Sequence, residues 1–469
     1  MEPITVAPYM FAGLVIFLLI GYPVAFSLAA VGLGFAFFGI ETNLLESSFL
    51  NTIPLRLFGI MSNDLLLAIP FFTLMGAILE RSRLAEDMIE GFGQLFGPVR
   101  GGLAYAVVLV GAILGAITGT VAASVIAMAL IALPVMMRYG YDMRLATGVI
   151  AASGTITQLI PPALVLVVLA DQLGRSVGDM YRGAIGPSVV QVALFCIYIL
   201  FLSLWRPTAM PALPAEARTL GGMALAWKLI RGMVPSLALI FVVLGTILLG
   251  LATPTESGAM GVAGALLLAV VSRRLSLSEF WHAVDATTRI STMVVFILIG
   301  STIFSSIFQG FYGGVWLEGL LRSLPGGQVG FLVFVNVFIF ILAFFLDFFE
   351  IAFIIIPLLA PVAEKLGIDL IWFGILIGAN MQTSFMHPPF GFALFYLRGV
   401  APEEVRTNDI YLGAIPWVGL QLVLVVILIF FPQIVTAFLE HGPAIDPNQI
   451  QELNIPSPED IPAPQLQPQ

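Results

Sequence analysis

Long apolar segments recur along this chain, and they constrain its fold more than any other feature of the sequence. Eight simple segments lie near 8–20, 23–40, 65–80, 185–205, 233–251, 258–272, 291–309 and 411–432. Hydrophobic residues make up 59% of the chain and charged residues only 10%, whereas about a quarter of an ordinary soluble domain is charged. One bilayer crossing takes about 20 apolar residues. We therefore expect an all-α polytopic membrane protein with about ten crossings, in contact with the lipid bilayer.

Two further apolar stretches, 102–137 and 328–363, are interrupted at their middles, at 115–120 and 347–350. Each interruption predicts a re-entrant hairpin. A double proline follows each hairpin, and it cannot continue a helix without loss of backbone hydrogen bonds. The two segments that carry the double prolines are expected to form broken helices, at about 143–173 and 370–397.

The chain also contains an internal repeat. A shift of 227 residues aligns two series of residues that typically end or break helices. It places Pro134, Gly140, Asp142, Pro161 and Pro162 on Pro361, Gly367, Asp369, Pro388 and Pro389. Leucine or alanine residues could coincide by chance at such a shift. A series of Pro, Gly, Asp and Pro-Pro in register is much less expected by chance. We predict two structural repeats, at 1–206 and 233–438, a connector at 207–232 and a disordered, acidic, proline-rich tail at 439–469.

Basic residues predict the topology, because cytoplasmic loops carry an excess of Lys and Arg. Two loops are rich in them, one with Arg206, Arg218, Lys228 and Arg231 and the other with Arg273, Arg274 and Arg289. If both loops are cytoplasmic, the first hairpin enters the membrane from the cytoplasm and the second from outside. The repeats would then have inverted topology, with both termini on the periplasmic side.

Inverted repeats with a broken helix in each half are typical of secondary transporters, whose binding sites lie near the bilayer midplane. Irregular backbone at that depth is tolerated only away from lipid. Polar side chains precede each double proline, and they are Ser153, Thr155, Thr157 and Gln158 in one half and Asn380, Gln382, Thr383 and Ser384 in the other. Their oxygens suit a small hard cation. The alternative is that they only satisfy the broken helices or pack them closely.

The hairpin tips differ in charge. Asp347 and Glu350 are the acids of the second tip, and an acid inside the membrane is a functional hypothesis by default. They could bind a cation, carry a proton or cap the hairpin helix. The first tip is uncharged and offers Thr118, Gly119, Thr120 and Ser124.

Other chemistry is less well supported. The three histidines lie far apart and Cys196 is the single cysteine, so no transition-metal site is expected. His387, directly before Pro388, is expected to make local hydrogen bonds. Arg398 could meet an organic anion or extend to the membrane surface. No Walker A pattern occurs, which gives no sign of a nucleotide-driven pump, and a net charge of -9 makes nucleic acid an unexpected partner.

Several short motifs together resemble the large membrane subunit of tripartite ATP-independent periplasmic (TRAP) transporters. They are LAIPFFTLMG at 67–76, GYD at 140–142, AASGT at 151–155, IPP at 160–162, PTE at 254–256 and PPFG at 388–391. The resemblance implies a sodium-coupled, elevator-type importer of organic acids in the bacterial inner membrane. It also implies two partners, a small four-helix membrane subunit and an extracytoplasmic substrate-binding protein, and no cofactor besides sodium.

The resemblance further implies ion sites where each hairpin tip meets the following broken helix. These sites correspond to 118–124 with 153–157, and to Asp347 with 380–384. As substrate contacts we expect Gln158, Pro161, Pro162, Gln382, His387, Pro388, Pro389 and Arg398. The alternatives are an ion channel, which would need a continuous polar pore, and a proton-coupled transporter of another family. An intramembrane enzyme is not expected, because Asp347 has no acidic partner in another span.

Overall fold

The computed structural model describes residues 2–439 except 82–83, 119, 274 and 390. Within these residues the secondary structure is helical, without strands, which confirms the all-α prediction. Seven of the described helices are long and apolar enough to cross a membrane, or nine spans if each of two bent helix pairs counts as one. The predicted disordered tail lies outside the described residues, apart from Leu439.

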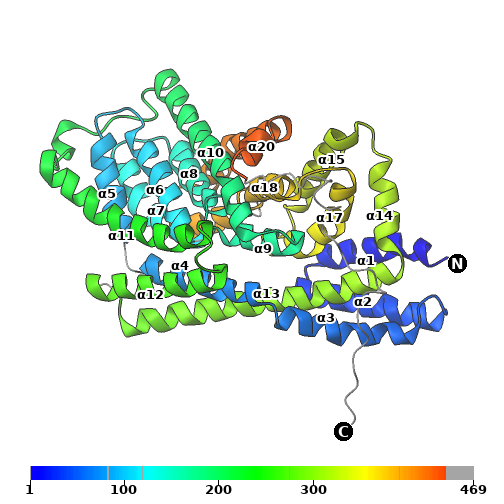
Figure 1. Ribbon diagram of the computed structural model, residues 1–469. Helices are drawn as coiled ribbons and strands as arrows, with labels where there is room; N and C mark the ends of the chain where they lie inside the picture. Colours follow the sequence, from blue (N-terminus) through cyan, green and yellow to red (C-terminus); the bar gives the residue numbers. More distant parts are fainter. Residues whose placement is uncertain (1, 82–83, 119, 274, 390, 440–469) are drawn as a thin grey trace, which may run out of the picture. The chain divides into compact units, whose positions relative to one another are not determined.

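The helices of the first half precede the connector (Figure 1). They are α1 (Ala7–Ile20), α2 (Val24–Glu41), α3 (Thr52–Met61), α4 (Ala68–Arg81), α5 (Leu84–Phe96), α6 (Gly102–Thr118), α7 (Val121–Arg138), α8 (Met143–Thr155), α9 (Leu164–Leu173) and α10 (Val177–Trp205). Helices α3 and α5 were not predicted from the sequence, because they are short and only partly apolar.

The second half has a matching order. Its helices are α11 (Gly222–Leu248), α12 (Pro254–Ser272), α13 (Leu277–Gly310), α14 (Gly313–Arg322), α15 (Gly327–Leu342), α16 (Phe348–Glu350), α17 (Ile356–Lys365), α18 (Leu370–Met381), α19 (Phe392–Val400), α20 (Thr407–Phe430) and α21 (Gln433–Thr436). A π-helical segment, Ile351–Ile355, joins α16 to α17. A shift of 227 residues carries α7 onto the run from α16 to α17, α8 onto α18 and α9 onto α19.

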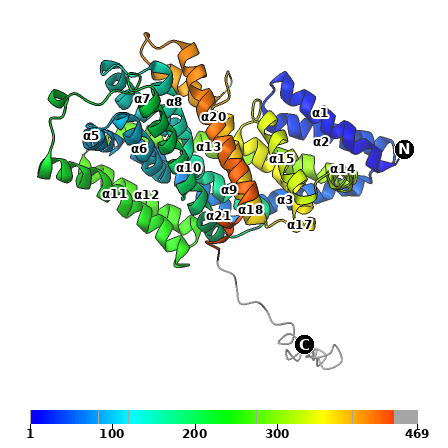
Figure 2. The same cartoon turned by 90° about the horizontal axis from the view of Figure 1, so that it is seen from above.

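Long helices form one side of the molecule. Helix α13 packs against α2 and α4, and α12 packs against α4 and α11. Figure 1 shows α12, α13, α2 and α3 along the lower edge, with α6 to α10 and α15 to α20 above them. In Figure 2, α1 and α2 lie at one end and α5, α11 and α12 at the other. The hairpins and broken helices therefore gather on one side of a long helical layer.

The two repeats interlock through α8 and α20. At their crossing a Cβ on Gly148 would collide with the Gly413 carbonyl, and a Cβ on Gly413 would collide with the Arg144 carbonyl. Only glycine allows this backbone contact, as is common where membrane helices pack closely. Contacts between α9 and α18 and between α7 and α19 add to the interlocking, so the two broken helices belong to one packed unit.

Two buried glutamine contacts also cross between the repeats. The amides of Gln191 on α10 and Gln382 exchange two hydrogen bonds, of 2.6 and 3.1 Å. Gln421 on α20 donates to the Thr155 hydroxyl at 2.8 Å. Each of these long helices thus holds the break of the opposite repeat.

Candidate functional site

Both broken helices have the same local form. Helix α8 passes into a short 3-10 turn, Ile156–Gln158, and α18 passes into another, Gln382–Phe385. The peptide bonds Pro161–Pro162 and Pro388–Pro389 are cis. Helices α9 and α19 then resume beyond the prolines. The breaks therefore place two new helix N-termini inside the packed unit.

A cavity of about 260 Å³ lies where the hairpin tips meet these breaks. Both repeats contribute to its wall, and the second does so partly through α13. The lining residues are Thr120, Val121, Ala122, Gln158, Leu164, Val165, Ile290, Met293, Asp347, Phe348, Phe349, Phe385, Phe392 and Tyr396. The cavity thus brings together the first tip, the second tip and both breaks, as a midplane binding site in an inverted-repeat transporter would require.

Three helix N-termini open onto this cavity. The first turns of α7, α9 and α19 contribute Val121, Leu164 and Phe392 to its wall. Their N-cap residues, Thr120, Ala163 and Gly391, make no side-chain capping hydrogen bond. A helix N-terminus carries a partial positive charge and unsatisfied N–H groups, which makes it a binding site for anions. These N-termini favour an anion in the cavity, whose described lining residues include one acid, Asp347, and no basic side chain.

The second hairpin tip differs, because its helix is already capped. The Asp347 carboxylate accepts a 2.9 Å hydrogen bond from the Glu350 backbone N–H, and the Glu350 carboxylate accepts one of 2.8 Å from the Asp347 N–H. This reciprocal arrangement is a capping box. Three roles were predicted for these two acids, and the described hydrogen bonds correspond to one of them, the capping of the hairpin helix. Asp347 also lies in the cavity wall.

The polar residues before the first double proline fall into two groups. The hydroxyls of Ser153 and Thr157 are buried and have no hydrogen-bond partner. The Thr155 hydroxyl, by contrast, donates to the Ala152 carbonyl at 2.8 Å and accepts from Gln421. Because a buried polar group without a partner is costly, Ser153 and Thr157 have oxygens left for a ligand.

The predicted residues of the first hairpin tip lie close to this region. Thr120 lines the cavity, and Ser124 is fully buried on α7. Thr118 is the last residue of α6, and Gly119 lies outside the described residues. Helix α6 packs closely on the break, since a Cβ on Gly111 would lie 2.7 Å from the Ser153 Cβ. The hairpin and the break thus form one compact unit.

In the second repeat the side-chain oxygen of Asn380 has no hydrogen-bond partner. Its Nδ2 donates to the backbone and side-chain oxygens of Asn336, at 2.7 and 3.0 Å, while its own Oδ1 is buried without a partner. Thr383 and Ser384 instead donate to backbone carbonyls within their own turn. No hydrogen bond joins Asp347 to these three residues in the described part of the chain. The sequence analysis missed Asn336, whose signal is an isolated amide in an apolar helix.

The predicted substrate contacts are only partly brought to the cavity. Gln158 lines it, whereas the four prolines of the breaks do not. Gln382 is paired with Gln191 behind the break. The Arg398 guanidinium donates to the Val405 carbonyl, so its side chain stabilises the turn after α19.

His387 is enclosed by aromatic rings of the second hairpin. Its imidazole stacks on Phe344 with a centroid distance of 4.1 Å and meets the edge of Phe340 at 4.4 Å. Neither ring nitrogen makes a hydrogen bond of ordinary geometry, and the residue is buried. The predicted local hydrogen bonds of His387 are therefore absent from the described contacts.

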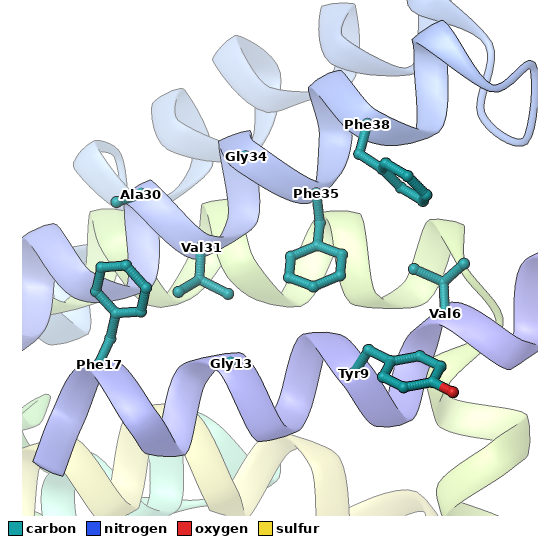
Figure 3. A pocket seen from close by; sticks show the side chains of 9 residues that line it. All are labelled: Val6, Tyr9, Gly13, Phe17, Ala30, Val31, Gly34, Phe35 and Phe38. Carbon is teal, nitrogen blue, oxygen red and sulfur yellow. The ribbon is translucent and has the colours of Figure 1, made fainter.

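Two larger cavities have lining chemistry that suits an organic anion less well. A groove of about 420 Å³ between α1 and α2 is almost wholly apolar, and Figure 3 shows the rings of Tyr9, Phe17 and Phe35 around it. Another cavity, of about 500 Å³, lies between α5, α6 and α7 and includes Glu86, Glu90 and Arg138. The first suits lipid chains, and in the second two acids accompany the one arginine and no residue of either break lines the wall. The cavity at the hairpin tips is therefore the best candidate site.

Five aromatic residues of this wall were missed by the sequence analysis, namely Phe348, Phe349, Phe385, Phe392 and Tyr396. Aromatic residues are frequent throughout the chain, so their presence alone does not indicate a binding site. The positions of Phe348, Phe349 and Phe392 could have indicated it, because these residues lie in the first turns after the predicted tip and break. A residue just beyond an interruption in a membrane helix faces the place where the interruptions meet.

Comparison with known proteins shows the family. The family model described as "Tripartite ATP-independent periplasmic transporter, DctM component" matches residues 11–434. The C4-dicarboxylate TRAP transporter large permease protein DctM of Pseudomonas aeruginosa is 29% identical over 82% of this chain and 88% of its own length. The 2,3-diketo-L-gulonate TRAP transporter large permease protein YiaN of Escherichia coli K12 is 26% identical over 79% of this chain and 85% of its own.

A solved structure shares the fold. The YdaH transporter of Alcanivorax borkumensis matches 94% of this chain and all of its own with a TM-score of 0.58, at 15% sequence identity. At that identity the likeness concerns the fold alone. It agrees with the all-α membrane architecture described above.

Proposed function

Because this chain belongs to the DctM family of tripartite ATP-independent periplasmic transporters, we propose that it uses a sodium gradient to import an organic acid by an elevator-type movement. The family consists of transporters and not of enzymes, and its membrane permeases serve organic acids. Sodium coupling and the elevator movement are the proposed parts.

Anion binding is supported chiefly by the three uncapped helix N-termini at one cavity. Helices α7 and α9 come from the first repeat and α19 from the second. Transporters built from broken helices use such termini to hold anionic groups of the substrate. Gln158 adds an amide that can donate to a carboxylate. A carboxylate at this place would satisfy N–H groups that no side chain of the N-cap residues satisfies.

Sodium binding is supported by unpartnered buried oxygens in equivalent parts of the two repeats. Ser153 and Thr157 lie at the first break, and Asn380 lies before the second. A sodium ion is a hard cation that prefers oxygen ligands, as calcium and magnesium do. These oxygens are adjacent to backbone carbonyls freed by the breaks. The residues present therefore fit a small cation, with Thr155 bound by Gln421 as a positioning residue.

The elevator movement is supported by how the cavity is built. The two tips and the two breaks belong to one interlocked unit, while Ile290 and Met293 of α13 form another side of the cavity. Substrate could pass to the other face of the membrane if the interlocked unit moved against α13. The two hairpins would then serve as gates on opposite faces. This role requires the inverted topology that the basic loops predict.

The proposal also covers the protein partners of this chain and its location in the cell. A tripartite transporter has two further components, and we assign these to a small four-helix membrane subunit and an extracytoplasmic substrate-binding protein. The location is the bacterial inner membrane, with both termini in the periplasm. Exposed aromatic side chains on α1 and α2, such as Phe17 and Phe37, leave an apolar surface for lipid or the small subunit.

Uptake into proteoliposomes tests the proposal. The complete transporter is reconstituted with its binding protein, and accumulation of a radiolabelled organic acid is measured with an inward sodium gradient and with a proton gradient alone. We expect accumulation only with sodium. Asn380→Ala should raise the sodium concentration for half-maximal uptake, whereas Arg218→Ala in the connector should not. Equal uptake on a proton gradient without sodium would contradict the coupling, and an unchanged sodium dependence of Asn380→Ala would contradict the site.

A further inference from the structure

The two repeats supply unlike walls to the same cavity, and this difference concerns the substrate. We propose that the cavity takes a monocarboxylate with an apolar, aromatic-sized body. Its carboxylate would face the first repeat and its body the second. The inference rests on the proposed function, because it assumes that the cavity holds the transported acid.

The unlike walls are visible in the pairs of equivalent positions. The 227-residue shift pairs Thr120 with Asp347, Val121 with Phe348, Ala122 with Phe349, Gln158 with Phe385 and Val165 with Phe392, and all ten residues line the cavity. In these pairs the first repeat contributes small or uncharged polar side chains. The second contributes four phenylalanines and one acid. A substrate bound between them meets an aromatic wall on one side. On the other side it meets small aliphatic residues with two polar groups, Thr120 and Gln158, and we call this side the polar wall.

The polar wall has donors without partners. The Gln158 side chain is only 6% exposed, and no hydrogen bond joins its amide to any residue in the described part of the chain. Thr120 lies beside the N-terminus of α7, and Leu164 begins α9. Backbone N–H groups and a buried amide with a free N–H can together hold one carboxylate.

The aromatic wall is continuous over the second break. The rings of Phe385 and Phe392 have centroids 6.5 Å apart, and Phe392 and Tyr396 are stacked at 6.5 Å. On the second hairpin tip Phe348 and Phe349 are 4.8 Å apart. These separations lie within the range over which aromatic rings attract one another. A ring or a compact apolar group of the substrate would therefore find contacts on this side.

Among the described residues of the aromatic side, the donors for a second carboxylate are the N-terminus of α19 and the Tyr396 hydroxyl, and the same side also carries the acid Asp347. No lysine or arginine lines the cavity among the described residues, and the charged group present is Asp347. The proposed sodium ligands Ser153, Thr157 and Asn380 do not line it either. A carboxylate placed against the five aromatic rings would lose its hydration on the side that carries Asp347, which is unfavourable. The cavity should thus discriminate against dicarboxylates.

The size of the cavity agrees with a small acid. A volume of about 260 Å³ corresponds to about nine water-sized groups at roughly 30 Å³ each. Benzoate has a similar number of non-hydrogen atoms, and so does succinate. Volume therefore does not separate the two acids, and the chemistry of the walls must do so.

Direct binding tests the inference. The full chain in lipid nanodiscs is titrated with benzoate and with succinate, in sodium chloride and in choline chloride, by saturation-transfer NMR. We expect benzoate to bind in sodium at least about ten-fold more tightly than succinate. Phe392→Ala should weaken benzoate binding by about ten-fold, because a ring contact is lost. Gln158→Leu should weaken both acids, since the donor to the carboxylate is removed.

Phe395→Ala is the matched control. Phe395 lies on the same helix and is 51% exposed, against 47% for Phe392, but it does not line the cavity. Both rings are exposed enough that neither substitution should unfold the chain. Tighter sodium-dependent binding of succinate, or equal effects of the two Phe→Ala variants, would overturn the inference and leave the proposed function intact. The absence of sodium-dependent binding for both acids would also overturn the inference, whereas the proposed function is contradicted by uptake that does not depend on sodium.

Discussion

Removal of the Thr157 hydroxyl tests whether its oxygen is an ion ligand, because only a ligand contributes to the gain in stability that sodium produces. Thr157→Val keeps the size and β-branching of the side chain and removes one buried oxygen that has no partner. An unsatisfied buried hydroxyl costs about 1 to 3 kcal/mol. Without sodium, the variant should therefore be more stable than the wild type by up to that amount.

In sodium this advantage of the variant should become smaller. Binding to the native state stabilises a protein by about 2.7 kcal/mol when the ligand is at 100 times its Kd. If the loss of one oxygen ligand weakens sodium ten-fold, the same concentration stabilises the variant by only about 1.4 kcal/mol. The sodium-dependent gain in stability should thus fall by about half, although the variant is well folded.

Thermal unfolding of the purified chain measures both quantities, in sodium chloride and in choline chloride of equal ionic strength. Thr155→Val is the matched control, because the Thr155 hydroxyl is hydrogen-bonded to Ala152 and Gln421. Thr155→Val should lower the Tm in both salts. If Thr157→Val keeps the full sodium-dependent gain, the Thr157 oxygen is not a ligand and the first ion site is wrong.

Three further predictions concern packing and topology. Gly111→Ala should lower stability by about 1 to 3 kcal/mol and raise the sodium needed for uptake, because the added methyl group presses on the first break. Gln191→Leu should cost about 1 to 3 kcal/mol in thermal stability by leaving the Gln382 amide unpaired. In a Cys196→Ala background, Leu251→Cys should react with an impermeant thiol reagent on intact cells, while Pro214→Cys should react only after permeabilisation.

Each of these predictions has its own control. Gly419→Ala adds a methyl group where nothing lies within 4 Å, so it should change neither stability nor sodium dependence. The double variant Gln191→Leu/Gln382→Leu removes both amides and should recover part of the lost stability. Labelling of Pro214→Cys in intact cells would contradict the inverted topology.

The architecture was accessible from sequence because its causes are local. A bilayer of given thickness demands apolar segments of given length, and every backbone polar group inside it must find a partner. Double prolines violate this second condition, and the sequence places them at two equivalent sites. The breaks, the hairpins and Gln158 in the site could therefore be predicted without knowledge of the packing.

The tertiary structure alone decided which polar atoms are left free and what faces the cavity. Thr155 and Thr157 are alike in sequence, but Gln421, 266 residues away, satisfies only the first. The aromatic wall was likewise hidden, because phenylalanine is common in every membrane helix and the lining side depends on how two repeats cross. Hydrogen-bond satisfaction and cavity shape arise from long-range packing, which the glycine contact between α8 and α20 holds together.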